Sequence, residues 1–165
     1  MFISPKLNAG MNAQIGHEFA ASQQYVAIAA WFASETLPSL SGKFFEQSAE
    51  ERGHALKFVR YILDAGGKVE IPALPAPKST FTTVEEVVKL SLEREKEVTR
   101  QISDLMALAV KEANFTAQQF LGWFVTEQLE EVSSMEALLK IVQRAGEKNL
   151  LFVEGFIARA AAAQK

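Results

Sequence analysis

The chain has no cysteine among its 165 residues, which excludes disulfide bonds, thiolate metal sites and cysteine nucleophiles. Its longest strongly apolar run, YVAIAAWFA, is too short to cross a bilayer, so no membrane partner is expected. The first residues, MFISPKLNAG, lack a basic segment followed by an apolar one, which is the pattern of a secretory signal. Together these absences favour a cytoplasmic protein.

An excess of positive charge is also missing. The formal net charge is −3, and the last residues, IARAAAAQK, contain no cluster of Lys or Arg. An acidic chain without a basic arm gives no reason to expect a nucleic acid partner. The content of 48% apolar and 22% charged residues is instead typical of a globular domain that buries a core.

Proline, glycine and capping residues divide the chain into helices. Pro5 and Pro38 stand at helix starts, where proline is tolerated, and Gly66 follows a helix end. The stretches TTVEE at 82–86 and TAQQ at 116–119 have the pattern of capping boxes. These signals predict four long helices near 5–35, 38–65, 83–113 and 116–145, and a short fifth helix at about 148–161.

The connection between the second and third predicted helices is long, whereas the others are short. Short connections join antiparallel neighbours, and one long crossover is the ferritin-like variant of the four-helix bundle. We therefore expect an all-α fold: a ferritin-like up-down four-helix bundle with a long crossover between helices 2 and 3 and a short fifth C-terminal helix. The whole chain, 1–165, is expected to form a single domain, with the bundle over 5–145.

Each predicted helix has an inward stripe that is apolar at both ends and polar in its middle. The polar residues at the four midpoints are Glu18 on the first helix, Glu51 with His54 on the second, Glu95 on the third, and Glu127, Gln128 and Glu131 on the fourth. Antiparallel packing of helices of similar length brings these midpoints to one depth. We therefore expect a group of carboxylates inside the bundle.

Such a group needs compensating charge, because an ionised carboxylate buried without a partner is strongly destabilising. The inward stripes contain no Lys or Arg, and none occurs between Lys6 and Lys43. Either most of these acids are protonated, or cations that the sequence does not supply are bound among them. Glutamates from two helices together with a Glu-x-x-His pair form the ligand set of di-iron carboxylate bundles, so we favour metal ions.

Each of these residues also has an ordinary interpretation when it is taken alone. Glu51 and His54, three residues apart, resemble a pair that occurs in many helices as solvated or core side chains. A solvated acidic face is the corresponding interpretation of Glu127, Glu130 and Glu131. Tyr25 has the pattern of a core tyrosine with a hydrogen-bonded hydroxyl. The coincidence of four helix midpoints favours a metal site over these alternatives.

Four motifs give the chain a resemblance to a known family over nearly its whole length. They are HEFAASQQY at 17–25, EERGH at 50–54, EREKE at 93–97 and WFVTEQLEE at 123–131. In these motifs the sequence resembles the haem-free ferritins of bacteria. The resemblance implies a ferroxidase centre in which Glu18, Glu51 and His54 bind a first iron. Glu51 and Glu95 bind a second iron, with Glu51 bridging the two.

The same resemblance places further residues around the two irons. Gln128 and Tyr25 fall beside the di-iron centre. The outer acids that match a third iron site are Glu50, Glu127, Glu130 and Glu131. Arg52 and Gly53 occupy the gap in which bacterioferritins have a haem-binding methionine, so no haem is expected.

For the function, the resemblance implies a homo-oligomeric shell of twenty-four identical subunits. Such a shell oxidises Fe(II) with O2 or H2O2 and stores the Fe(III) mineral inside. Two rival functions stay open on the residues alone. A di-iron oxidase or peroxidase of the rubrerythrin type usually has two Glu-x-x-His motifs, whereas this chain has one. A metal-free helical scaffold would contain no iron and would be a small oligomer.

Overall fold

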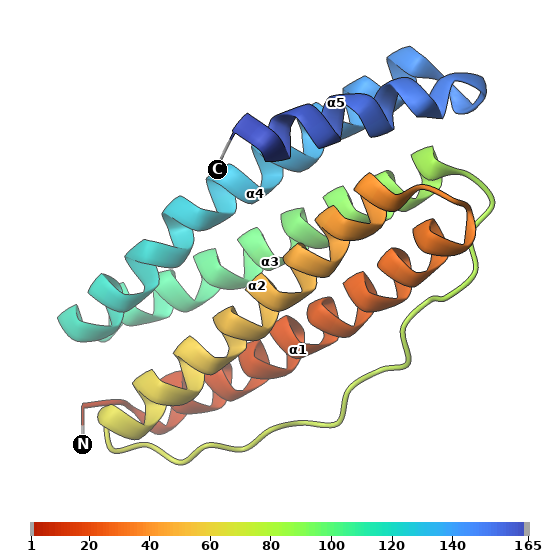
Figure 1. Ribbon diagram of the computed structural model, residues 1–165. Helices are drawn as coiled ribbons and strands as arrows, with labels where there is room; N and C mark the ends of the chain where they lie inside the picture. The colour runs from red at the N-terminus through yellow and green to blue at the C-terminus, as the bar shows by residue number, and fades with distance from the viewer. Residues whose placement is uncertain (1, 164–165) are drawn as a thin grey trace.

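The computed structural model describes residues 2–163, which fold into helices joined by one long and several short connections. The elements are α1 (Pro5–Ser34), α2 (Pro38–Asp64), α3 (Val84–Lys111), α4 (Phe115–Ala145), the 3-10 helix η1 (Glu147–Asn149) and α5 (Leu150–Ala163). Helices α1 and α2 pack as one pair, α3 and α4 as another, and α5 lies against α2 and α4 (Figure 1). The expected ferritin-like bundle with a short fifth helix is confirmed, with bounds close to the predicted ones.

The long connection, residues 65–83, runs along the bundle beside α1, so that α3 follows the same direction as α2 (Figure 1). Amide side chains of α1 hold it in place. Asn12 accepts a hydrogen bond from the backbone N–H of Glu70 at 2.9 Å, and Gln24 bonds both backbone groups of Lys78. Between them, a Cβ atom on Gly16 would lie 2.3 Å from Cγ of Pro72. Glycine therefore allows the connection to approach α1 closely.

Side-chain oxygens satisfy the first N–H groups of three helices. Ser4 accepts from Leu7 at the start of α1, and Thr83 accepts from Glu86 at the start of α3, as expected for the capping box there. The box predicted at 116–119 is wrong. Asn114 caps α4, and Thr116 lies inside the helix, because the N-cap stands two residues earlier than the Thr-x-x-Gln pattern indicated.

Helix α2 is capped by a residue from the other end of the chain. Its own N-cap, Leu37, has no side-chain acceptor. Glu154 of α5, which is 8% exposed, accepts hydrogen bonds from the backbone N–H groups of Ser39 at 2.7 Å and Leu40 at 2.8 Å. A carboxylate at this position also interacts favourably with the positive end of the helix dipole. This contact fixes α5 on the bundle.

The buried side chains form two apolar clusters with a polar layer between them. One cluster is centred on Phe32 and Phe44, and the other on Met11, Phe58 and Phe124. The layer between them consists of the midpoints of the four long helices, where the predicted acids lie. Within residues 2–163, none of the helices has the length and apolar character needed to cross a membrane.

Candidate metal centre

The middle of the bundle contains a layer of acids that are almost completely removed from solvent. Glu18 is 0% exposed, Glu51 and Glu95 are each 1% exposed, and Glu131 is 7% exposed. The four residues come from α1, α2, α3 and α4 in that order. Each helix therefore contributes one buried carboxylate to the same layer, as its apolar stripe predicted.

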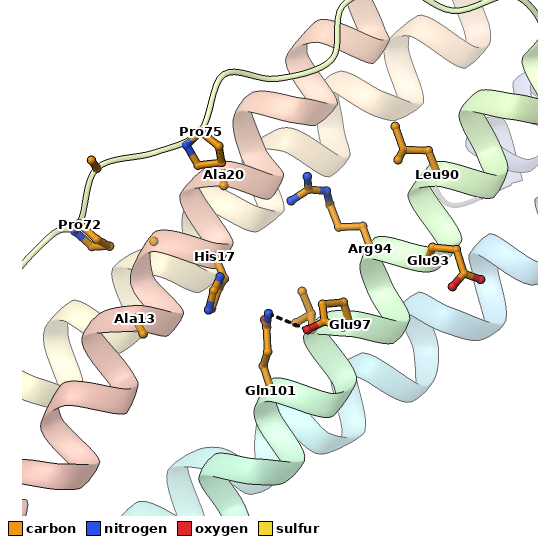
Figure 2. Close-up of a pocket in the computed structure, with 13 residues that line it drawn as sticks. Ala13, His17, Ala20, Pro72, Pro75, Leu90, Glu93, Arg94, Glu97 and Gln101 are labelled. Carbon is orange, nitrogen blue, oxygen red and sulfur yellow. Dashed lines mark hydrogen bonds between the residues drawn. The ribbon is translucent and has the colours of Figure 1, made fainter.

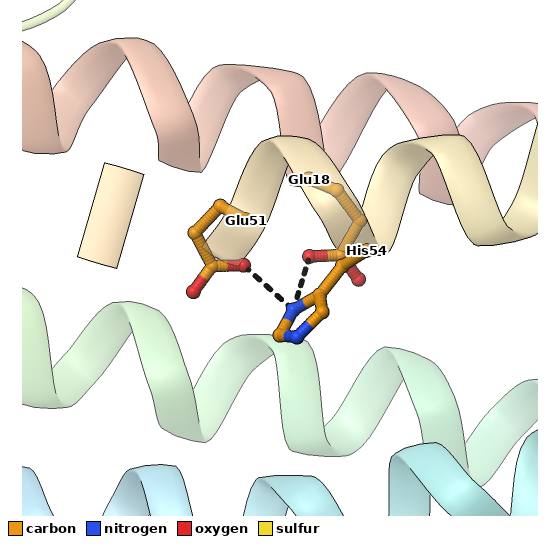
Figure 3. Close-up of side chains that lie close together, drawn as sticks. All are labelled: Glu18, Glu51 and His54. Atoms are coloured by element: carbon orange, nitrogen blue, oxygen red, sulfur yellow. Dashed lines mark hydrogen bonds and ion pairs between the residues drawn. The ribbon is translucent and has the colours of Figure 1, made fainter. Parts of the chain in front are cut away.

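The first group that can bind a metal ion is Glu18, Glu51 and His54, whose ligand atoms all lie within 4.8 Å of one another. Nδ1 of His54 is 3.1 Å from Oε2 of Glu51 and 4.0 Å from Oε2 of Glu18 (Figure 3). This Oε2 atom of Glu18 is buried without a hydrogen-bond partner. A buried carboxylate oxygen with no donor is destabilising by itself, and a cation at this point satisfies it.

A second group shares one acid with the first. Glu51, Glu95 and Glu131 also offer ligand oxygens within 4.8 Å of one another. Glu51 therefore lies between two clusters of ligands, one on the side of α1 and the other on the side of α3 and α4. This is the position that a carboxylate must have to bridge two metal ions.

A third group lies toward the surface. His54, Glu127 and Glu131 form it, with Nε2 of His54 3.8 Å from Oε1 of Glu127. A cavity of about 240 Å³ opens beside this group, and Glu50 and Glu130 are among the residues that line it. Glu50 and Glu130 are exposed and join none of the three groups within residues 2–163. The predicted outer acids thus divide into two that approach His54 and two that lie farther out.

Tyr25 and Gln128 both contact Glu95. The Tyr25 hydroxyl donates a short hydrogen bond to Oε1 of Glu95. The Gln128 side-chain amide donates to Oε2 of Glu95 at 3.3 Å and to the Glu95 backbone carbonyl at 3.2 Å. Both residues are buried, so the carboxylate of Glu95 is held from two sides. Trp123, by contrast, is 41% exposed and presents its ring edge-on to His54.

The electrostatics of the layer favour protonated acids when no metal is bound. Burial raises the pKa of Glu18 well above its usual value, and the nearby charge of Glu51 raises it further. Burial, again reinforced by Glu51, raises the pKa of Glu95 to about 7. Burial and the charge of Glu95 raise that of Glu131 to about 8. The ion pairs of these buried acids within residues 2–163 are with His54 alone.

Opposing effects act on the pKa of His54. Burial lowers the pKa of its imidazole, but the hydrogen bond to Glu51 and the surrounding acid charges outweigh it, and the pKa is raised. The layer thus contains more acidic than basic side chains, so some of the acids must be protonated when no metal is bound. A divalent cation replaces several of these protons at once, because its charge is the compensation that Lys or Arg would otherwise provide.

Comparison with known proteins agrees with this geometry. The family described as the ferritin-like domain matches residues 8–145, which is nearly the whole four-helix bundle. The chain belongs to the ferritin family. Ferritin BfrB of Mycobacterium tuberculosis is 44% identical over 154 residues, which cover 93% of this chain and 84% of BfrB. A bacterial non-heme ferritin of Staphylococcus aureus is 36% identical over 152 residues, 92% of either chain.

A solved ferritin structure has the same fold. The open pore ferritin of Archaeoglobus fulgidus superimposes with a TM-score of 0.91 at 30% sequence identity, over 94% of this chain and 96% of the archaeal chain. The function of the chain is therefore ferritin iron storage, and ferritins are ferroxidases. The buried Glu and His groups are consistent with a di-iron ferroxidase centre.

Sequence reasoning missed two residues of this ferritin centre. Gln14 donates a hydrogen bond to Oε1 of Glu18 at 2.9 Å. Gln47 donates to Oε1 of Glu51 at 3.1 Å and to Oε2 of Glu131 at 2.8 Å. Both glutamines are buried, and each stands four residues before an acid on its own helix. That i, i+4 spacing is the signal from which they are predictable.

A groove between α1 and α3 lies outside the centre. A hollow of about 530 Å³ separates α1 from α3, and His17 projects into it together with Arg94, Glu97 and Gln101 (Figure 2). His17 is exposed, although it is the neighbour of Glu18 in the sequence. The two histidines of the chain therefore have separate surroundings. His54 contacts the buried acids, whereas His17 lies on the outside of the bundle.

Proposed function

We propose that two Fe(II) ions bind at the centre of the bundle as substrates. Glu18, Glu51 and His54 hold the first ion, and Glu51 and Glu95 hold the second. The observation that supports this most directly is the position of Glu51, which belongs to two separate groups of potential ligands. The unpartnered Oε2 of Glu18 supports the first of these positions.

The ligand types suit oxidation of iron. Carboxylate oxygens and one imidazole bind Fe(II), and the hard, negative oxygens stabilise Fe(III) more strongly than Fe(II). Two Fe(II) ions give up two electrons, which reduce O2 and two protons to H2O2, or H2O2 and two protons to two molecules of water. Metal binding displaces protons from acids with raised pKa values, so the centre has protons close at hand. Tyr25 and Gln128 orient Glu95 during these steps.

A third iron position follows from the outer group. Glu127 and Glu131 are proposed to bind it, with Glu50 and Glu130 lining the cavity through which Fe(III) leaves. Glu131 lies within reach of Glu51 and Glu95 as well as of His54 and Glu127. This shared acid supports a direct passage from the second iron to the third. The proposed route of Fe(III) ends at the mineral inside the shell.

For the whole protein, we propose one ferritin-like domain over 1–165 in a homo-oligomeric shell of twenty-four subunits that takes Fe(II) and O2 or H2O2 and binds no haem. The family membership, and the match to 92% of the Staphylococcus aureus ferritin and 96% of the archaeal ferritin, support this proposal. Residues 1, 164 and 165 lie outside the described part of the chain.

Replacing His54 by alanine tests the assignment of the centre. The His54→Ala variant loses the nitrogen ligand and should oxidise Fe(II) at least about tenfold more slowly than the parent in stopped-flow absorbance, while retaining the same assembly size. His17→Ala is the matched control, because His17 is exposed and lies outside the ligand groups. Equal oxidation rates in the His54→Ala variant and the parent contradict the assignment.

A further inference from the structure

Neutral amides surround the acids of the centre. Gln14 donates to Glu18, and Gln128 donates to Glu95. Gln47 differs from both, because its one side-chain nitrogen donates to two acids on two helices. It bonds Oε1 of Glu51 on α2 at 3.1 Å and Oε2 of Glu131 on α4 at 2.8 Å. Within residues 2–163, no other side-chain amide bonds two of these acids.

The orientation of the Gln47 amide follows from its surroundings. The nitrogen has two hydrogens, and each of the two contacts uses one of them. The opposite orientation would place the amide oxygen against two carboxylate oxygens, which is repulsive. Gln47 is 7% exposed and stands one helical turn before Glu51, so its side chain has little freedom to leave this position.

We propose that Gln47 is a positioning residue that couples the di-iron centre to the third iron position. This inference rests on the function proposed above. One oxygen of each carboxylate accepts from Gln47, which places Oε2 of Glu51 toward Nδ1 of His54 at 3.1 Å and keeps Oε1 of Glu131 outside the Gln47 contact. The amide thus holds Glu131 toward Glu51 in the orientation at which both iron positions can use it.

The neutral charge of the amide is essential to this role. A Lys or Arg in place of Gln47 would orient the two carboxylates equally well but would repel an incoming Fe(II) ion. An apolar side chain would leave both carboxylates without this donor and free to turn away. Removing a hydrogen-bonding partner of a metal ligand typically lowers metal affinity about 10- to 100-fold. The loss of metal affinity should fall on the third iron position, because Glu131 has fewer hydrogen-bond partners besides Gln47 than Glu51 has.

Co(II) titration of the metal-free, assembled protein tests the inference, because Co(II) is not oxidised under these conditions and its visible bands report ligand geometry. Gln47→Met keeps the length of the side chain and removes the donor. Its weakest Co(II) position should bind about tenfold more weakly than in the parent, with altered bands. Gln143→Met is the matched control, because Gln143 is exposed and bonds Glu85, which belongs to none of the ligand groups. It should leave that weakest position within about twofold of the parent.

The outcomes separate this inference from the proposed function. If Gln47→Met binds Co(II) at all positions as the parent does, Gln47 only fills space and the inference is wrong, while the centre stands. If the parent itself binds fewer than two Co(II) ions per chain, the proposed function fails and the inference fails with it. Gln47→Leu provides the same comparison should the methionine variant not assemble.

Discussion

Replacing Glu131 by glutamine measures how much an ionised buried acid destabilises the fold of the metal-free protein. Burial and the charge of Glu95 raise the pKa of Glu131 from 4.5 to about 8, so the folded state binds a proton that the unfolded state releases. The folded state has more bound protons between pH 4.5 and 8, and its stability therefore falls as the pH rises through this window. Above pH 8 the full penalty is present, and below pH 4.5 it is absent.

The size of the effect follows from the shift. At about 1.4 kcal/mol for each pH unit, the rise in pKa corresponds to at most about 5 kcal/mol. Since relaxation of the neighbouring acids reduces this value, we expect Glu131→Gln to stabilise the metal-free protein by about 2–4 kcal/mol at pH 8.5. For a chain of this length that is a rise of roughly 5–10 °C in Tm. At pH 4.5 the variant and the parent should melt within about 2 °C of each other.

Thermal unfolding of both proteins with a chelator present, at pH 8.5 and at pH 4.5, provides the comparison. The amide of the new glutamine keeps the volume of the acid and can accept from Gln47, so packing changes little. Glu130→Gln is the matched control, because Glu130 is exposed on the same helix. The reasoning is refuted if the Tm difference between Glu131→Gln and the parent is the same at both pH values.

Three substitutions and one metal-binding measurement have further defined outcomes. Glu154→Ala removes the acceptor for two N–H groups at the start of α2, and should lower the free energy of unfolding by about 1–2 kcal/mol in denaturant titration; an unchanged midpoint would mean that water replaces the cap. Gly16→Ala should destabilise the fold by about 1–3 kcal/mol, because the new Cβ meets the long connection at 2.3 Å. Gly42→Ala, at a position on α2 where the new Cβ meets no other atom, should instead stabilise the fold by up to about 1 kcal/mol. A change in the free energy of unfolding with the same sign for both variants would contradict this packing. Co(II) binding at pH 6 should release more protons than at pH 9, since the pKa of Glu95 is about 7 without metal. Calorimetry in buffers of different ionisation enthalpy measures the number of protons released. A number that does not change with pH would contradict the raised pKa.

The fold was largely predictable because helix signals in this chain are strong and local. Pro5 and Pro38 mark helix starts, Gly66 follows the end of α2 with φ of 75°, and the apolar stripes repeat at helical spacing. The capping pattern at 116–119 predicted the wrong N-cap, because the side chain of Asn114, two residues before Thr116, is the acceptor at the helix start. The contact of Glu154 with α2 was not predictable, since it joins residues more than a hundred positions apart.

The composition of the centre was predictable, but its internal hydrogen bonds were not. The position of an acid in the middle of an apolar stripe is a property of the sequence, and burial of Glu18 and Glu95 followed from it. Which amide reaches which carboxylate depends on side-chain rotamers and on the offset between neighbouring helices. Spacing indicates that Gln47 is near Glu51, yet only the packing of α2 on α4 brings it to Glu131.

The measurement that tests the central claim most directly is a stopped-flow titration of the metal-free protein with Fe(II) under air, on an assembly sized beforehand by gel filtration. We expect a fast ferric absorbance phase that saturates near two irons per chain, on a very large assembly. A fast phase on a small oligomer would indicate a di-iron enzyme without storage. Oxidation no faster than that of Fe(II) in buffer would contradict the account, because the buried acids of α1 to α4 would then not form a ferroxidase centre.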